Sequence, residues 1–183
     1  MGVEVQVIHN ASIMNACGIC GLQLYRFGET VSIVFFTETW RHGDSFYDKI
    51  ARNGDLHTLC LLDIRVREIS YDDMIATGKV VYEEPRFMSA RLAAAQLLEV
   101  EARRGDGACA PDRRAFALAR VGAADQVIVS GTLERLSKDD VDEVLGAPLH
   151  SLIIAGDLHE HEELFYERFH IDKRVPSKGE VDP

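Results

Sequence analysis

The sequence has no hydrophobic run long enough to cross a membrane. Its longest apolar stretches, such as residues 31–36, fall far short of the roughly 20 residues that a spanning helix needs. The N-terminus shows neither the basic segment nor the long apolar stretch of a signal peptide. Gln6 stands where an N-myristoylation signal requires Ser or Thr. These absences predict a cytoplasmic protein with no membrane partner.

Positive charge is also scarce. The chain has 20 Lys and Arg residues against 30 Asp and Glu residues, which gives a formal net charge of −10 at pH 7. The basic residues occur as short pairs, such as Arg103 with Arg104, and form no stripe. Non-specific binding of nucleic acid depends on clustered cations. The composition therefore predicts no nucleic-acid partner and is compatible with a protein or a small molecule as substrate.

Cysteine is rare, and the four cysteines suggest no disulfide framework. Cys17 and Cys20 have the spacing of a zinc knuckle or a redox site. A zinc knuckle needs a second pair of ligands, and none is obvious nearby. Both cysteines lie on the apolar face of an expected helix. We interpret them as core residues that pack as small hydrophobic side chains, and we predict no metal.

Strand and helix patterns alternate along the chain, which predicts an α/β fold. We expect strands at residues 3–8, 31–37, 58–66, 115–121, 126–130 and 149–155. We expect helices at residues 12–28, 44–53, 70–78, 89–104, 137–146 and 159–169. The strand at 58–66 is apolar on both faces at first and should be central. The turn at 122–125 predicts an antiparallel hairpin, and residues 105–112 predict a flexible excursion.

Two groups of polar residues allow more than one interpretation. Asp63 lies within an apolar strand and is either a buried, paired carboxylate or a group that faces a substrate. His159 and His161, with Glu162 and Glu163, are either a metal cluster or part of a solvated terminal helix. We favour the helix interpretation for the second group.

Seven segments, in order along the chain, together resemble the diphthine synthases. They are residues 7–16 (VIHNASIMNA), 21–34 (GLQLYRFGETVSIV), 57–64 (HTLCLLDI), 85–89 (PRFMS), 118–123 (LARVGA), 131–133 (GTL) and 148–154 (PLHSLII). Each segment alone is a weak match, but seven in register make coincidence improbable. The resemblance runs from residue 3 to about residue 155.

The resemblance implies a tetrapyrrole methylase-like (class III methyltransferase) fold of two α/β domains, with S-adenosyl-L-methionine bound between them and usually a homodimer. Residues 1–11 would be the last strand and linker of a truncated N-terminal domain. Residues 12–172 would be the C-terminal α/β domain, with a mixed sheet flanked by helices, and residues 173–183 a flexible tail. The family's Gly-rich opening (GLGLGD) and a later GDPFGATTH-like loop are absent from this sequence. One wall of the cofactor cleft should therefore be missing.

The function implied by the resemblance is S-adenosylmethionine-dependent methylation of the modified histidine of translation elongation factor 2, in diphthamide biosynthesis. The wording of two segments favours the eukaryotic type, whose members also methylate a carboxylate. The alternative is a non-catalytic dimerisation or elongation-factor-binding module made of the second domain alone. A relative acting on a small molecule is a weaker option, because porphyrin methylases have Pro-Gly where this chain has residues 9–15.

The resemblance also implies five cofactor contacts, which are Ser12, Ile13, Leu62, Val121 and His150. Each has a structural alternative: Ser12 can act only as a helix cap, Leu62 and Val121 can be core residues, and His150 can be a hydrogen-bonded structural residue. In-line transfer of a methyl group depends mostly on alignment. We therefore expect no catalytic triad, and the sequence identifies no catalytic residue.

Overall fold

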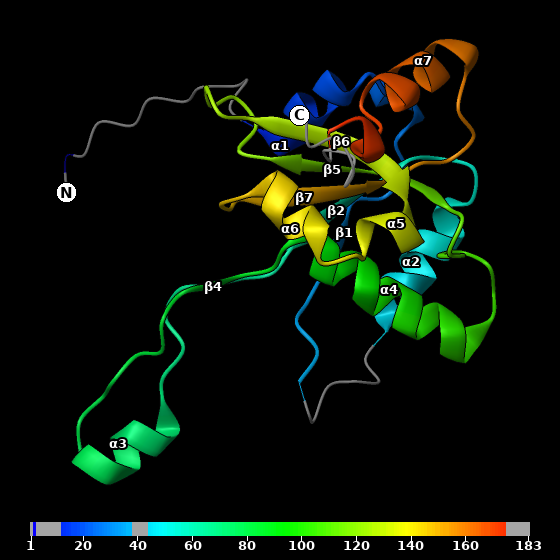
Figure 1. Cartoon of the computed structure of the whole chain (residues 1–183). Helices are drawn as coiled ribbons and strands as arrows, with labels where there is room; N and C mark the ends of the chain where they lie inside the picture. The colour runs from blue at the N-terminus through cyan, green and yellow to red at the C-terminus, as the bar shows by residue number, and fades with distance from the viewer. Residues whose placement is uncertain (1, 3–11, 38–43, 175–183) are drawn as a thin grey trace, which may run out of the picture.

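A mixed five-stranded sheet lies at the centre of the computed structural model, which describes residues 2, 12–37 and 44–174 (Figure 1). In spatial order the strands are β1 (Val31–Ile33), β2 (Thr58–Leu62), β7 (His150–Ile154), β5 (Arg114–Ala119) and β6 (Val127–Thr132). β1 and β2 are parallel, while the other three pairings are antiparallel. The α/β class, the position of β2 inside the sheet and the β5–β6 hairpin are confirmed.

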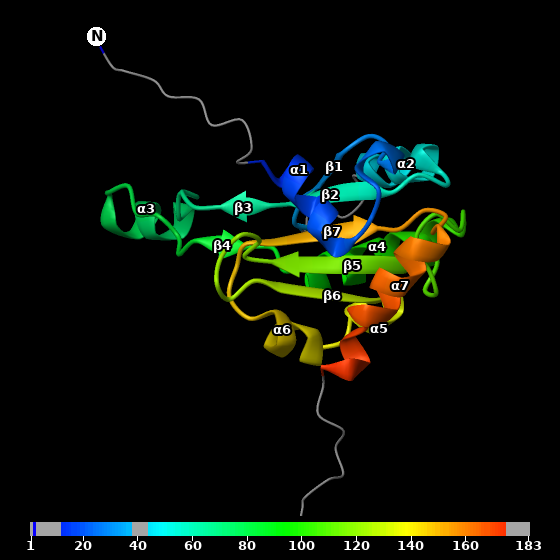
Figure 2. The ribbon, with the colours of Figure 1, turned by 90° about the horizontal axis from the view of Figure 1, so that it is seen from above.

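Helices cover both faces of the sheet (Figures 1 and 2). The helices on one face are α2 (Ser45–Asn53), α4 (Ala90–Arg104), α5 (Leu133–Leu136) and α6 (Asp140–Leu145). The other face carries α1 (Ile13–Ala16), the 3₁₀ turns η1 (Cys17–Cys20) and η2 (Leu24–Arg26), and α7 (Glu160–Arg168); η3 (Ile171–Lys173) follows α7.

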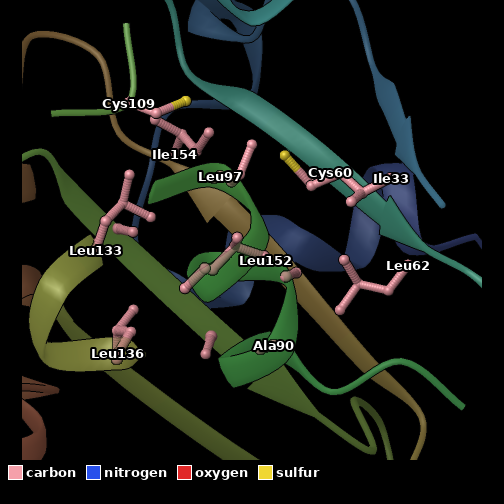
Figure 3. Close-up of a cluster of buried hydrophobic side chains, with 14 of the residues drawn as sticks. Ile33, Cys60, Leu62, Ala90, Leu97, Cys109, Leu133, Leu136, Leu152 and Ile154 are labelled. Carbon is pink, nitrogen blue, oxygen red and sulfur yellow. The ribbon is translucent and has the colours of Figure 1, made fainter. Parts of the chain in front are cut away.

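Alternation along the strands feeds two separate cores. In β7, Leu152 and Ile154 point into the larger core under α4, whereas Ile153 points into the smaller core under α7. Figure 3 shows the larger core, in which Leu97 of α4 lies among side chains from the sheet. Burial of both faces of the central strands explains their near-continuous apolar sequences.

The caps of two helices follow the sequence prediction. Ser70 precedes α3 (Tyr71–Thr77) and Ser89 precedes α4, and each hydroxyl accepts a backbone N–H from the first turn of its helix, at 3.3 and 3.2 Å. Both helices end at glycines, Gly78 and Gly105, in the left-handed conformation that glycine adopts at little cost.

The expected helix at residues 12–28 is wrong. The chain instead forms α1, η1 and η2, and Gly21, with φ +92°, turns it away after η1. A Cβ atom on Gly21 would lie 2.1 Å from the ring of Phe165, so this turn closely approaches α7. Cys17 and Cys20 are nevertheless buried and free, as predicted. Burial raises the pKa of the Cys20 thiol to about 12, so it is protonated at neutral pH.

The expected strand at 58–66 ends early. β2 stops at Leu62, and Asp63 accepts the backbone N–H of Phe35 at 3.1 Å and Nε of Arg65 at 3.0 Å. Asp63 is thus a paired carboxylate. The chain continues as β3 (Ile64–Arg65), which pairs with β4 (Arg86–Phe87) in a separate two-stranded sheet. We call residues 64–87 the arm; it projects from the body and carries α3 at its far end (Figures 1 and 2).

Two further differences concern connections. Residues 105–112 contain no helix or strand, but Glu101 accepts the backbone N–H groups of Gly107 and Cys109, each at 2.8 Å, and Cys109 is buried. The expected excursion is therefore tied to α4. The short helix α5 was not predicted from the sequence.

The predicted strand at 3–8 and most of the predicted tail lie outside the described residues, and the division into domains stays a prediction. Among the helices of the described residues, none combines the length and the apolar composition needed to span a bilayer.

Candidate cofactor-binding site

A cavity of about 740 Å³ opens where the C-terminal ends of β2 and β5 meet the N-terminal end of β7. These ends meet because β7 lies between β2 and β5 and is antiparallel to both. The start of α1 closes one side of the cavity. The lining residues are Ser12, Ile13, Ala16, Leu61, Leu62, Ile64, Leu118, Arg120, Val121, Gly122, Leu149, His150 and Ser151.

All five cofactor contacts implied by the family resemblance line this one cavity. They come from four places that are distant in sequence: the start of α1, the end of β2, the turn after β5 and the start of β7. The fold therefore brings together residues that are far apart in the sequence. Their role toward a cofactor stays a prediction.

Ser12 is also a helix cap, as its structural alternative required. Its hydroxyl accepts the backbone N–H of Met14 at 3.3 Å. Because α1 has only four residues, it offers a weak macrodipole. The start of α1 therefore attracts an anion only weakly.

Leu62 and Val121 form part of the apolar wall. Leu62 belongs to the larger core and is 9% exposed, while Val121 packs against the smaller core. Leu61, Ile64 and Leu118 extend the same wall. Leu62 and Val121 therefore belong both to the packed interior and to the wall of the cavity.

The imidazole ring of His150 is held on both sides. Its Nδ1 accepts the backbone N–H of Ala90 at 3.4 Å, and its Nε2 lies 3.1 Å from the carbonyl oxygens of Gly146 and of Ala147. Two acceptors at Nε2 require the proton there, which gives a neutral ring. Burial lowers the pKa of His150, in agreement with this state. The ring thus fixes the start of α4 and the loop before β7, both beside the cavity.

Arg120 was missed by the sequence analysis. It has a left-handed backbone (φ +48°), which is uncommon for a residue with a Cβ atom. Its guanidinium donates to the carbonyl oxygen of Leu145 at 2.7 Å, to that of Ala147, and to a carboxylate oxygen of Asp125 at 2.6 Å. Its backbone N–H donates to the carbonyl oxygen of Leu149 at 2.9 Å. Arg120 therefore joins two loops into one wall, and its only sequence signal was its place beside Val121.

One of the two histidines at the start of α7, His159, has a structural role. His159 caps the helix by accepting the backbone N–H of His161 at 3.3 Å, and Glu162 completes a capping box. Glu162 is buried and accepts from Gln23, His159 and His57, so it does not share a solvated face with the histidines. Exposed ligand atoms of His159, Glu160 and His161 lie within 4.8 Å of one another, but the positive end of a helix disfavours a cation.

Comparison with known proteins finds relatives of the chain. No family model matches the chain. The chain is 54% identical over 169 residues to a probable diphthine methyl ester synthase of Arabidopsis thaliana, covering 91% of this chain and 59% of that protein. It is 50% identical over 186 residues to the diphthine methyl ester synthase of Mus musculus, covering 98% of this chain and 64% of that protein. The chain thus spans about three fifths of the length of these relatives.

Solved structures agree with the sequence relatives. A structure from Entamoeba histolytica described as a diphthine synthase matches with a TM-score of 0.76 and 44% identity, over 92% of this chain and 61% of that one. Another diphthine synthase matches with a TM-score of 0.64 and 28% identity, over 92% of this chain and 55% of that one. The fold is therefore tetrapyrrole methylase-like, and over nearly its whole length the chain is similar to about three fifths of the length of the diphthine methyl ester synthases.

Proposed function

We propose that this chain is part of an S-adenosylmethionine-dependent methyltransferase of diphthamide biosynthesis, and that the cavity between β2, β5 and β7 binds the cofactor. One observation carries the proposal: Ser12, Ile13, Leu62, Val121 and His150 line the same cavity. The relatives that are named diphthine methyl ester synthases support the reaction class.

The residues present fit a cofactor of this kind. The cavity, at about 740 Å³, is within the usual range for small-molecule sites. Leucine, isoleucine and valine side chains line one wall and suit the flat face of an adenine ring. Ser12 and Ser151 supply hydroxyl groups among these apolar side chains.

The bound cofactor would supply a methyl group on a sulfonium sulfur. The task of the chain is then to hold the cofactor and the acceptor in line, which requires positional accuracy rather than a triad. His150 and Arg120 serve this need indirectly, because their hydrogen bonds fix the loops that form the wall of the cavity.

We propose further that the acceptor is the modified histidine of translation elongation factor 2. The acidic composition, with a net charge of −10, suits a protein acceptor better than a nucleic acid. A cytoplasmic location and a homodimer complete the proposal.

Titration calorimetry of S-adenosylhomocysteine into the purified chain tests cofactor binding. We expect saturable micromolar binding that weakens at least tenfold in the variant Leu149→Asp. Leu149 lines the cavity but is 52% exposed, so its replacement should not prevent folding. A bound cofactor would bury the added carboxylate against the apolar wall without a partner.

Leu164→Asp is the matched control, because Leu164 is 68% exposed on α7 and does not line the cavity. Its affinity should equal that of the unmodified chain. Absence of binding by a folded chain, shown by its circular dichroism and cooperative melting, would contradict a cofactor site made of these residues alone.

A further inference from the structure

Exposed apolar side chains gather on the arm. Among residues 12–37 and 44–174, fifteen large hydrophobic side chains are exposed, and seven of them belong to the arm. These seven are Ile64, Val66, Tyr71, Ile75, Val80, Tyr82 and Phe87. The arm projects away from the two cores, so the described body of the chain does not cover its far end (Figures 1 and 2). A concentration of this kind marks an interaction surface.

The far end of the arm presents a defined apolar face. Tyr71 and Ile75 are 67% and 80% exposed, and their spacing of four residues puts them on the same side of α3. Val80 and Tyr82 follow on the returning chain, where Tyr82 pairs with Ile69. This face is apolar and accessible, and none of the residues of α3 is buried.

The base of the arm is held rigidly to the body. Arg65 donates to Asp63 at 3.0 Å and to Glu68 at 2.5 Å, and Arg86 also donates to Glu68. The guanidinium groups of Arg65 and Arg86 each lie 5.6 Å from the centre of the Phe35 ring. Ion pairs and stacking on both strands therefore fix the direction in which the arm projects.

The arm begins at the rim of the cavity. Ile64 is the first residue of β3 and also lines the cavity, two residues after Leu62 at the end of β2. A partner lying along the arm would thus have its surface next to the cavity opening. Ile64 is the residue that the arm and the cavity lining share.

We infer that the arm is the docking surface for the protein that carries the methyl acceptor, and that it holds this protein so that the acceptor side chain enters the cavity. This inference rests on the proposed function. A folded protein cannot enter a cavity of about 740 Å³, so only its modified side chain is bound there. Specific complexes need about 800 Å² of surface on each partner. The apolar face of the arm would form part of such a surface, beside the cavity.

Surface plasmon resonance tests this inference. Elongation factor 2 whose modified histidine is not yet methylated is immobilised, and binding of the 183-residue chain to it is measured. The double variant Tyr71→Ser/Ile75→Ser should bind at least tenfold more weakly. The matched control, Tyr25→Ser/Leu164→Ser, removes two exposed apolar side chains far from the arm and should bind normally. Both variants should keep the affinity for S-adenosylhomocysteine, because neither alters the cavity.

Equal weakening by both variants, unchanged binding by the arm variant, or no binding by the unmodified chain would overturn the inference. The inference would also be overturned if Tyr71→Ser/Ile75→Ser dissociated a dimer, seen by light scattering, and left binding of the elongation factor unchanged. The arm would then join two copies of the chain. The unmodified chain could instead fail to bind S-adenosylhomocysteine and still bind the elongation factor through the arm. That result would count against the proposed cofactor site.

Discussion

Two glutamates, one in the body and one at the base of the arm, each accept hydrogen bonds from several groups. The first is buried, whereas the second is partly exposed to water. Glu162 is 1% exposed and accepts from the backbone N–H groups of Gln23 and His159 and from His57. Glu68 has a side chain that is 30% exposed, and it pairs with Arg65 and Arg86. The carboxylate of Glu162 accepts from its donors where water cannot reach it. The carboxylate of Glu68 competes with solvent water for its partners.

This difference separates what each glutamate can contribute. A buried donor that loses its acceptor cannot turn to solvent, so removal of the acceptor carries the full desolvation cost. An exposed ion pair is screened, and its charges are readily solvated again. The body should therefore depend on Glu162 for its stability, while the arm should depend on Glu68 only for its orientation.

The largest effect is expected from Glu162→Ala. The change leaves the N–H groups of Gln23 and His159 without their acceptor and removes the partner of a buried histidine. We expect the free energy of unfolding to fall by about 3–5 kcal/mol, because each of the three donors left without its acceptor costs about 1–3 kcal/mol. Urea denaturation followed by circular dichroism measures the loss. Glu160→Gln, at an exposed position on the same helix, is the control, and an equal loss in both variants would contradict the role of Glu162.

Acidification should weaken the body by a smaller amount. Burial lowers the pKa of His57; Arg26 and Arg113 lower it too, while Glu162 opposes them. The unfolded chain then takes up a proton near pH 6.5, whereas the folded chain does so only at lower pH. The stabilisation is present above pH 6.5 and is lost as the pH falls below that value. The urea midpoint should therefore be lower at pH 5.5 than at pH 7.5.

The variant His57→Gln should reduce this pH dependence without abolishing it, because burial also lowers the pKa of His150. His57 accepts the backbone N–H of Gly156 at 3.0 Å through Nδ1, a bond that the amide oxygen of glutamine can replace. An unchanged slope between pH 5.5 and pH 7.5 in this variant would show that His57 is not a source of the dependence.

The comparison between body and arm also shows what sequence could predict. Caps at Ser70 and Ser89 are local, because the capping hydroxyl and the N–H that it binds are three residues apart. The β5–β6 hairpin was equally local. The break at Gly21 depends on Phe165, 144 positions away, so helical spacing in residues 12–28 gave no warning of it.

The candidate site follows the same division. No local pattern marks Leu62 or Val121 as more than core, and it was the resemblance to a family that singled them out. Arg120 acquires its role only through carbonyl groups some 25 residues later in the chain. The arm escaped prediction because β3 and β4 have two residues each and pair across 20 intervening positions, with no extended apolar pattern of their own.

The smallest effect on global stability, and the sharpest test of the comparison, is expected from Glu68→Ala. The variant should keep the urea midpoint of the unmodified chain, because Glu68 contacts neither core. It should, however, accelerate hydrogen exchange of the amides that hold the arm together, such as Ser70, which donates to the carbonyl oxygen of Val81 at 2.9 Å. Amides of β5 and β7 are the internal control and should exchange as before. If exchange in the arm is unchanged, Glu68 does not orient it, and Phe35 with Asp63 must fix its base; if β5 and β7 accelerate as well, the arm and the body unfold as one unit.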